Sequence, residues 1–160
     1  MNLRRDIMAT HSDLGREDAR DVSALLKQLS AGAPEVMRED ISEVALGARL
    51  MVVRDLDAPR GDGYRIVAMA TLVIQRTLMG RSGYVHDVVV DEAYRGKGIA
   101  ERLNRRLIEE AQRLGMRHID LTSGPEREAA NRLYLKLGYE RRGANVYRKK
   151  LDGSTSSPPA

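Results

Sequence analysis

The pattern of apolar and polar residues is clearest between residues 84 and 115. Residues 85–90 are apolar and β-branched except for His86 and Asp87, which predicts a mostly buried strand. After Gly98 the apolar residues recur every three to four positions, which predicts an amphipathic helix. These residues are Ile99, Leu103, Leu107, Ala111 and Leu114. Gly115 follows at a position where a left-handed residue commonly ends a helix.

The first third of the chain has two shorter helical patterns. Ser12 or Asp13 can cap the first helix, whose apolar stripe consists of Ala19, Val22, Leu25, Leu26 and Leu29. Gly32 interrupts this stripe, and Pro34 can occupy the first position of a second helix. The second stripe ends near Gly47 and consists of Met37, Ile41, Val44 and Ala45. A short strand over residues 7–10 is expected to precede both helices.

Three strands with short connections are predicted between these helices and the central turn. Residues 50–53 form a compact apolar run, residues 64–74 form a longer β-branched run, and residues 85–90 follow as the third strand. The polar residues 55–63 predict a hairpin loop, and residues 80–83 predict a second turn. Strands joined in this way form an antiparallel meander.

The last part of the chain predicts a strand, a helix and a closing strand. Residues 118–121 form the strand, Ser123-Gly124-Pro125 interrupts it, and residues 126–137 form the helix, with Gly138 at its end. Residues 145–151 predict the closing strand. Residues 152–160 contain too little apolar surface to fold, so we expect one domain over residues 1–151 and a disordered tail.

The composition of the chain limits the chemistry that the protein can carry out and the compartment in which it is expected. The chain has 160 residues, of which 42% are hydrophobic and 31% charged, as expected for one domain with a sizeable core. It has no cysteine, which excludes disulfides, thiolate metal ligands and a cysteine nucleophile. The sequence shows neither a long apolar span nor the pattern of a signal peptide. We therefore expect a cytoplasmic protein without a membrane partner.

The turn before the central helix has the chemistry of a phosphate site. Its sequence is Arg95-Gly96-Lys97-Gly98-Ile99-Ala100. The first N–H groups of a helix lack partners and carry partial positive charge, and glycines let an anion approach the backbone. The two basic side chains add full charges. The spacing matches neither a Walker loop nor a dinucleotide fingerprint. An ordinary strand-to-helix turn with solvated charges is the alternative interpretation.

Two segments resemble the GNAT superfamily of acetyl-CoA-dependent N-acetyltransferases. Residues 95–100 fit its Gln/Arg-x-x-Gly-x-Gly/Ala pyrophosphate loop, and Val90 lies where the family has an apolar strand residue. Downstream, a second segment is similar to the family's Asn-x-x-Tyr-x-Lys-x-Gly-Phe/Tyr pattern, namely Asn131-Arg132-Leu133-Tyr134-Leu135-Lys136-Leu137-Gly138-Tyr139. The resemblance covers residues 64–151, and the first third only in pattern. Residues 87–98 also distantly resemble the amino-sugar phosphate acetyltransferases.

The resemblance implies the GNAT (acyl-CoA N-acyltransferase) fold. This is an α/β fold with a mixed, mostly antiparallel sheet and a central parallel strand pair, flanked by about four helices. The strand, helix and strand predicted over residues 85–121 independently favour such a parallel pair. The implied function is transfer of an acetyl group from acetyl-CoA to a primary amine of a small molecule or protein, by direct attack in a ternary complex. A homodimer is common among members of the family and is therefore a candidate assembly.

The resemblance also assigns residues to the cosubstrate acetyl-CoA. The pyrophosphate would be bound by Arg95, Gly96, Lys97, Gly98, Ile99 and Ala100. The strand backbone at Val88, Val89 and Val90 would bind the pantetheine arm and stabilise the oxyanion. Asn131 and Tyr134 share a helix face because they are three residues apart. The resemblance implies that this asparagine hydrogen-bonds the cofactor and that this tyrosine lies beside its sulfur.

Acetyl transfer to an amine needs a base and an acid. Histidine as a residue type can act as a base near neutral pH, and His86 occupies a position that, by resemblance, often carries the base. The alternative is a partly buried core histidine without a catalytic role. Asp87 is expected to be structural or to orient a neighbour, on the opposite strand face unless a bulge intervenes. Tyr134 is the candidate acid, since a phenol can donate to a thiolate, and a core aromatic is the alternative. No metal is expected, because His11 and His118 lack metal-spaced partners.

Two other functions stay open. A GNAT-like module could bind an acyl-CoA as a sensor or regulator without turnover, although the candidates His86, Asn131 and Tyr134 favour catalysis. The net charge of +4 fits coenzyme A, an acidic or phosphorylated acceptor, or simply a mixed surface on which arginine outnumbers the acids. The second alternative is a basic nucleic-acid-binding domain, but nucleic acid is not expected as a partner, because the arginines are interspersed with Glu and Asp.

Overall fold

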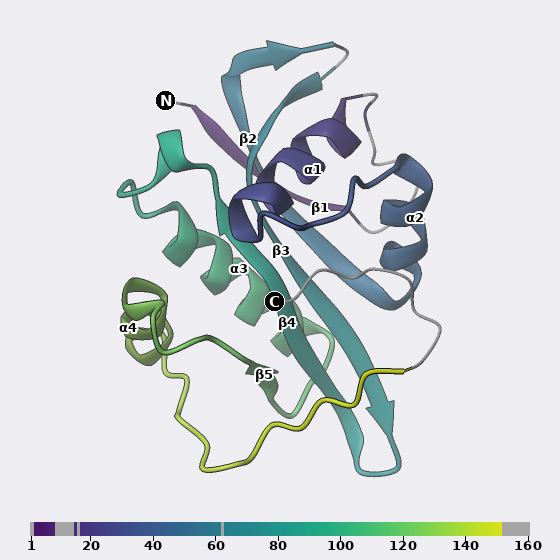
Figure 1. Ribbon diagram of the computed structural model, residues 1–160, viewed down its shortest axis with the longest axis vertical. Coiled ribbons are helices and arrows are strands. Elements are labelled where there is room, and N and C mark those ends of the chain that lie inside the picture. Colours follow the sequence, from purple (N-terminus) through teal and green to yellow (C-terminus); the bar gives the residue numbers. More distant parts are fainter. Residues whose placement is uncertain (1, 9–14, 16, 62, 152–160) are drawn as a thin grey trace.

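The computed structural model in Figure 1 describes residues 2–8, 15, 17–61 and 63–151. Its elements in chain order are β1 (Leu3–Met8), α1 (Asp18–Leu29), α2 (Arg38–Gly47), β2 (Ala48–Arg60), β3 (Gly63–Thr77), β4 (Gly80–Val90), the 3-10 turn η2 (Glu92–Tyr94), α3 (Ile99–Arg113), β5 (Ile119–Leu121) and α4 (Glu128–Lys136). The predicted caps Ser12 and Asp13, the end of the strand predicted over residues 7–10, and the tail 152–160 lie outside the described residues. In the described part, no helix is both long and apolar enough to cross a membrane.

The sheet has five strands in the order β1-β2-β3-β4-β5. The first three pairings are antiparallel. The last pairing is parallel and runs from Gly83 opposite Ile119 to Val85 opposite Leu121, with α3 as the crossover. The predicted mixed, mostly antiparallel sheet with one parallel pair and four flanking helices is therefore confirmed.

Each face of the sheet has its own aliphatic core. On one face α3 packs through a cluster made of Met51, Val53, Val67, Ala68, Ala70, Leu72, Val85, Ile99, Leu103, Leu107 and Ala111. On the other face, where Figure 1 shows α1 lying across the strands, the cluster is made of Val22, Leu25, Ile41, Leu50, Val52, Ile66, Met69 and Val89. Side chains alternate along a strand, so the neighbours Val52 and Val53 belong to different cores.

The central segment folds as its pattern predicts. β4 ends at Val90, and α3 begins directly after Gly98 and buries the predicted stripe against the sheet. Gly115 has a φ of +66°, and Gly138, after α4, has a φ of +88°, as expected for left-handed residues that end helices. The two N-terminal helices also form, because each has apolar residues that cover part of the sheet. The second begins at Arg38 and not at Pro34, and of its predicted stripe only Ile41 and Ala45 are buried, whereas Met37 and Val44 are exposed.

Two expected loops are strand in the structure, contrary to the prediction. β2 continues to Arg60 and β3 begins at Gly63, so the residues 55–63 expected as a hairpin loop mostly remain in the sheet, with an irregular register between Asp55 and Pro59. Residues 80–83 likewise begin β4, and the turn lies at residues 78–79. An antiparallel ribbon that extends past the core keeps its hydrogen bonds while its side chains face water. Polar residues therefore do not end it.

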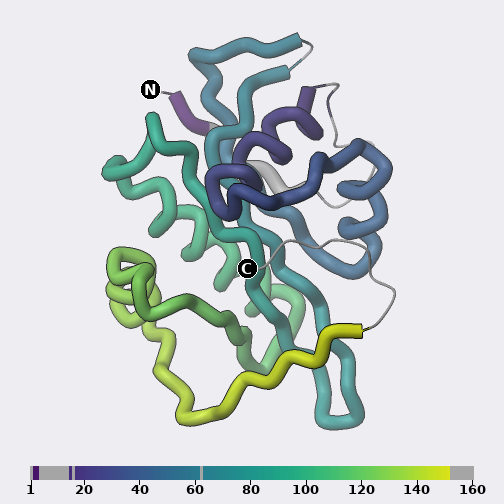
Figure 2. The backbone as a smooth tube through the Cα atoms, viewed as in Figure 1, coloured from purple at the N-terminus to yellow at the C-terminus, as the bar shows by residue number. Residues whose placement is uncertain are grey.

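The predicted closing strand over residues 145–151 does not form. The chain from Tyr139 to Leu151 has neither helix nor strand, and Figure 2 shows it as the extended green-to-yellow segment that follows α4. Val146 and Tyr147 are 78% and 86% exposed. A strand forms only beside a neighbour that supplies hydrogen bonds, and β5, the last strand of the sheet, has just 3 residues.

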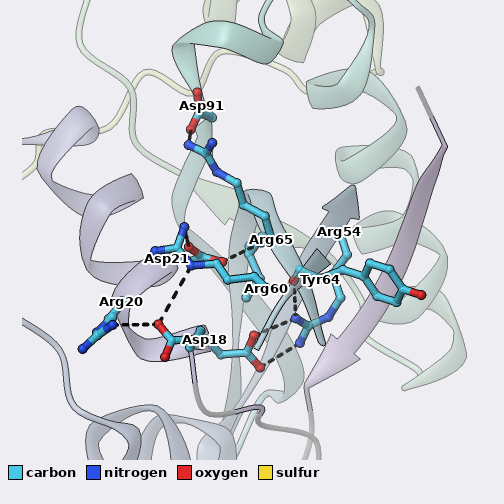
Figure 3. Close-up of polar contacts among 10 residues, drawn as sticks. Asp18, Arg20, Asp21, Arg54, Arg60, Tyr64, Arg65 and Asp91 are labelled. Carbon is cyan, nitrogen blue, oxygen red and sulfur yellow. Dashed lines mark hydrogen bonds and ion pairs between the residues drawn. The ribbon is translucent and has the colours of Figure 1, made fainter. Parts of the chain in front are cut away.

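Buried ion pairs join α1 to the sheet (Figure 3). Asp18, at the start of α1, accepts two hydrogen bonds from Arg54 of β2, at 2.6 Å and 2.8 Å, and both side chains are buried. Asp21 accepts a backbone N–H of β3 at 2.9 Å and lies 3.2 Å from Arg60. Burial raises the pKa of Asp21. These contacts orient α1, because a buried charge is stable only where it is paired and hydrogen-bonded.

We expect Asp18→Ala to lower the free energy of unfolding by about 3 kcal/mol, because it removes the carboxylate that Arg54 meets in a buried site. Urea denaturation followed by circular dichroism measures this loss. Arg20→Ala is the control, since Arg20 is exposed and pairs with Glu17 at the surface, where a pair is worth less than about 1 kcal/mol. Equal losses in the two variants would contradict a special role of the buried pair.

Candidate active site

A bulge interrupts β4 in its middle. Between the register pairs Met69–Val89 and Thr71–His86, β4 has one residue more than β3. Asp87 has a φ of +54°, the one positive value among the described residues other than glycine. Its Oδ2 accepts a hydrogen bond of 3.0 Å from Thr71 Oγ1. Asp87 therefore holds the bulge, and the bulge bends the strand and re-aims the side chains beside it.

His86 lies immediately before the bulge and is exposed. Its ring centroid lies 4.7 Å from that of Tyr84, and the two rings are tilted by 31°. The side chain belongs to neither core, so the alternative of a partly buried core histidine is wrong. An exposed imidazole can take a proton from an amine directly or through a water molecule.

Beyond Val85, β4 has no strand partner on the β5 side among the described residues. The ladder with β5 ends at Val85 opposite Leu121, whereas the ladder with β3 continues to Val90 opposite Ala68. Val88 and Val90 pack against the cluster between the sheet and α3, and Val89 belongs to the cluster between the sheet and α1. The backbone of this stretch can therefore hydrogen-bond another extended group on its free edge.

The loop after η2 contains two left-handed glycines. Gly96 has a φ of +75° and Gly98 a φ of +71°, which other residues rarely adopt. α3 begins directly after Gly98, which has no side chain to cap the helix. Among the described residues, no atom beyond the chain neighbours lies within 4 Å of where a Cβ would stand on either glycine. The first N–H groups of α3 therefore fit an anion such as a pyrophosphate.

Two exposed cations alternate with these glycines, Arg95 before Gly96 and Lys97 between Gly96 and Gly98. Arg95 Nε donates to the Val90 carbonyl at 3.1 Å, and Lys97 Nζ donates to the Ala93 carbonyl at 3.1 Å. Arg95 is only loosely paired, at 3.8 Å from Glu92. Both charges are held close to the loop by neutral carbonyls, so they can still neutralise a bound phosphate.

Asn131 and Tyr134 lie one turn apart on α4, as their spacing predicts. Asn131 Nδ2 donates to the Gly124 carbonyl at 2.9 Å. Tyr134 is half-buried, and its ring packs edge-on against Tyr139 with the centroids 5.6 Å apart. Burial raises the pKa of both phenols, more strongly for Tyr139, so both stay protonated at neutral pH.

Two long-range contacts place α4 beside the start of α3, directly after the loop 95–100, and beside the end of α1. Lys136 Nζ donates to Glu101 Oε2, in the first turn of α3, at 2.7 Å. Arg127 donates to the carbonyl of Leu29, the last residue of α1, at 3.5 Å. The sequence did not identify either contact, because the partners are 35 and 98 positions apart. Together they bring the two motifs of the sequence to one region of the fold.

The family of this protein follows from comparison with known sequences. A model of the acetyltransferase (GNAT) family matches residues 30–139. The glucosamine 6-phosphate N-acetyltransferase 1 of rice (Oryza sativa subsp. japonica) is 37% identical over 128 residues, which cover 76% of this chain and 74% of the rice protein. The chain belongs to the GNAT family of acetyltransferases.

Solved structures agree with this GNAT assignment. The glucosamine-6-phosphate N-acetyltransferase of Arabidopsis thaliana has the same fold, with a TM-score of 0.73 at 19% identity over 93% of this chain and 99% of that one. An acetyltransferase of Trypanosoma brucei matches with a TM-score of 0.68 at 27% identity over 94% and 99%. This GNAT protein is an N-acetyltransferase, as predicted, and enzymes of the family use acetyl-CoA as the donor. The cytoplasmic location, the homodimer and the roles of individual residues stay predictions.

If His86 is the base of this GNAT enzyme, His86→Ala should lower kcat by about 100-fold or more and remove the acid limb of the pH–rate profile. Release of free thiol from acetyl-CoA, followed from about pH 6 to pH 9, measures both effects. His118→Ala is the matched control, because His118 is also exposed and pairs at 3.6 Å with Asp120. An unchanged rate and pH profile in His86→Ala would contradict the role.

If Tyr134 is the acid, Tyr134→Phe should lower kcat by at least about tenfold, with little change in the KM for the donor, because the ring and its packing remain. The raised pKa keeps the phenol protonated to higher pH, so the wild-type rate should not fall on the alkaline side below about pH 10. Tyr147→Phe is the control at an exposed tyrosine. A wild-type kcat in Tyr134→Phe would show that the hydroxyl is not the acid.

Proposed function

We propose that this enzyme transfers the acetyl group of acetyl-CoA to the amino group of a phosphorylated amino sugar, by direct attack in a ternary complex. The main observation behind the proposal is that the segments 95–100 and 131–139, distant in sequence, lie in one region of the fold. Lys136 on α4 contacts Glu101 at the start of α3 at 2.7 Å. The acceptor class is supported by the relation to the rice enzyme, whose name specifies glucosamine 6-phosphate.

On the donor side, the loop 95–100 and the start of α3 would bind the pyrophosphate of acetyl-CoA. The supporting observations are the left-handed Gly96 and Gly98 and the exposed charges of Arg95 and Lys97. The pantetheine arm would lie along the free edge of β4 at residues 88–90, where the ladder with β5 has ended. Its amide groups can supply the hydrogen bonds that a further strand would otherwise make.

The chemical step would use three groups on β4 and α4. His86 would take the proton from the attacking amine, and a backbone N–H near Val88 would stabilise the oxyanion. Tyr134 would donate its proton to the leaving thiolate. Burial raises the pKa of Tyr134, whereas the charge of Arg127 lowers it. Arg127 thus keeps the phenol a stronger acid than burial alone would allow.

On the acceptor side, Arg127 would bind the phosphate of the amino sugar. Its side chain is 49% exposed and spans from the start of α4 to the last carbonyl of α1. Its nearest acid, Glu126, is 4.0 Å away, a distance too long for a strong ion pair. A guanidinium can bind a phosphate with two parallel hydrogen bonds, and here it would hold the acceptor beside Tyr134.

Thermal unfolding and thiol release test the proposal in two steps. Acetyl-CoA and CoA should raise the unfolding midpoint more than ATP does, since a ligand bound only by the native state stabilises it. Glucosamine 6-phosphate should then release thiol faster than glucosamine or a peptide with a free amino group. A midpoint shift without thiol release with any amine would instead support an acyl-CoA-binding regulatory module. If acetyl-CoA and CoA do not shift the midpoint, the proposed donor site is wrong.

We expect Arg127→Gln to raise the KM for glucosamine 6-phosphate by about tenfold or more and to leave the KM for glucosamine nearly unchanged. The expected factor corresponds to the free energy of one hydrogen bond to a charged group. Steady-state assays at saturating acetyl-CoA separate the two acceptors. Arg132→Gln is the matched control, because Arg132 is exposed on the same helix and lies 3.4 Å from Glu128. Equal changes for both acceptors would show that Arg127 does not bind the phosphate.

A further inference from the structure

Tyr94 ends the turn η2 just before the phosphate loop, and its hydroxyl reaches a buried carboxylate. It donates to Asp55 Oδ2 on β2 at 2.7 Å, across 39 residues of sequence. Asp55 is only 6% exposed. Its other oxygen accepts the backbone N–H of Asp57 at 3.0 Å. The carboxylate is therefore fixed on the sheet, and it anchors one end of the tyrosine ring.

The same ring carries a cation of the phosphate loop. Lys97 Nζ lies 5.0 Å from the centroid of the Tyr94 ring, within the range of a cation–π contact. The ammonium also donates to the Ala93 carbonyl. A surface lysine normally samples many rotamers, and these two contacts restrict it. Tyr94 thus connects the buried Asp55 to the exposed charge of Lys97.

The backbone of η2 is held by other contacts, which do not involve the tyrosine. The backbone N–H of Asp91 donates to a carbonyl of β3 at 2.9 Å. The carboxylate of Asp91 accepts one hydrogen bond from Arg65 at 2.8 Å (Figure 3) and another from the N–H of Ala93 at 3.0 Å. The N–H of Glu92 donates to Gln28 of α1 at 2.9 Å. The turn is thereby fixed to the sheet and to α1. The position of the turn therefore does not depend on the hydroxyl of Tyr94, which donates to Asp55 instead.

The charge states agree with this arrangement. The hydrogen bond from Tyr94 lowers the pKa of Asp55, and the positive charge of Lys97 adds to that effect. The same bond raises the pKa of Tyr94. At neutral pH the pair therefore consists of a neutral phenol and an ionised carboxylate. A neutral ring beside the loop does not repel a bound phosphate, and its face stays attractive to the ammonium.

We propose that Asp55 and Tyr94 are positioning residues for the donor's pyrophosphate, and that they act through Lys97. The inference rests on the proposed function for the identity of the ligand. Asp55 anchors the ring of Tyr94, and the ring restricts the side chain of Lys97 within the loop. The ordered ammonium can then bind the phosphate with less loss of rotamer freedom. Because this contact is with the pyrophosphate, the two residues act on donor affinity and not on the chemical step.

The test compares a ligand that has the pyrophosphate with one that lacks it. Tyr94→Phe removes the hydroxyl and keeps the ring, and Tyr94→Leu removes both. By titration calorimetry, the Kd for CoA should rise by about threefold in Tyr94→Phe and by about tenfold in Tyr94→Leu. The kcat at saturating acetyl-CoA should stay at the wild-type value. With acetyl-pantetheine, which has no pyrophosphate, kcat/KM should be the same in the wild type and both variants.

A double-mutant cycle identifies the residue through which Tyr94 acts. In a Lys97→Gln background, Tyr94→Leu should add little further loss of CoA affinity. Full additivity would overturn the proposal, and so would an unchanged Kd in Tyr94→Leu or an equal loss with acetyl-pantetheine. Tyr147→Phe, at an exposed tyrosine, is the control.

Asp55→Asn keeps the shape of the carboxylate and covers the case in which Tyr94→Leu fails to fold. It should raise the Kd for CoA by about threefold, like Tyr94→Phe, and an unchanged Kd in both variants would overturn the proposal. Wild-type protein that does not bind CoA would overturn the proposed function, and this inference with it. Wild-type binding together with unchanged variants would overturn this inference alone.

Discussion

The N–H and C=O groups along the edge of a strand need hydrogen-bonding partners, from the protein, from water or from a ligand. In this protein the edge is that of β4 beyond Val85, where β5 no longer accompanies it. The bulge at Asp87, tied to Thr71, bends the strand at the same place. An extended ligand can supply the missing partners, and the chain then continues through a glycine loop into the uncapped start of α3. The candidate site thus combines an incomplete parallel ladder with a following helix that has no side-chain cap at its start.

The excess of arginine has two different explanations in the structure. Some arginines neutralise buried acids, as Arg54 does for Asp18 and Arg113 for Glu110, and these pairs orient helices or close the end of α3. Others, such as Arg95 and Arg127, lie at the candidate site with weak acidic partners. The net charge of +4 therefore combines structural pairing with a small number of cations that can meet an anionic ligand.

The elements that could be predicted are those whose signal is local. The stripe of α3 and the glycine loop before it are contiguous in sequence, so periodicity and backbone chemistry were enough to place both. The prediction was wrong over residues 55–63 and 145–151, where strand formation depends on a neighbour and not on the segment itself. For His86 the sequence identified the residue but not its exposure, because a bulge decides on which side of a strand a residue lies.

By itself the sequence determined the order of the elements from α1 to α4, the two motifs and the family they resemble, since each depends on residues close together in the chain. Only the tertiary structure decided that Lys136 reaches Glu101 and that Tyr94 reaches Asp55. These partners are 35 and 39 positions apart. The free energy of such a contact depends on burial, distance and orientation, and no local pattern encodes these quantities until the sheet and its helices have brought the side chains together.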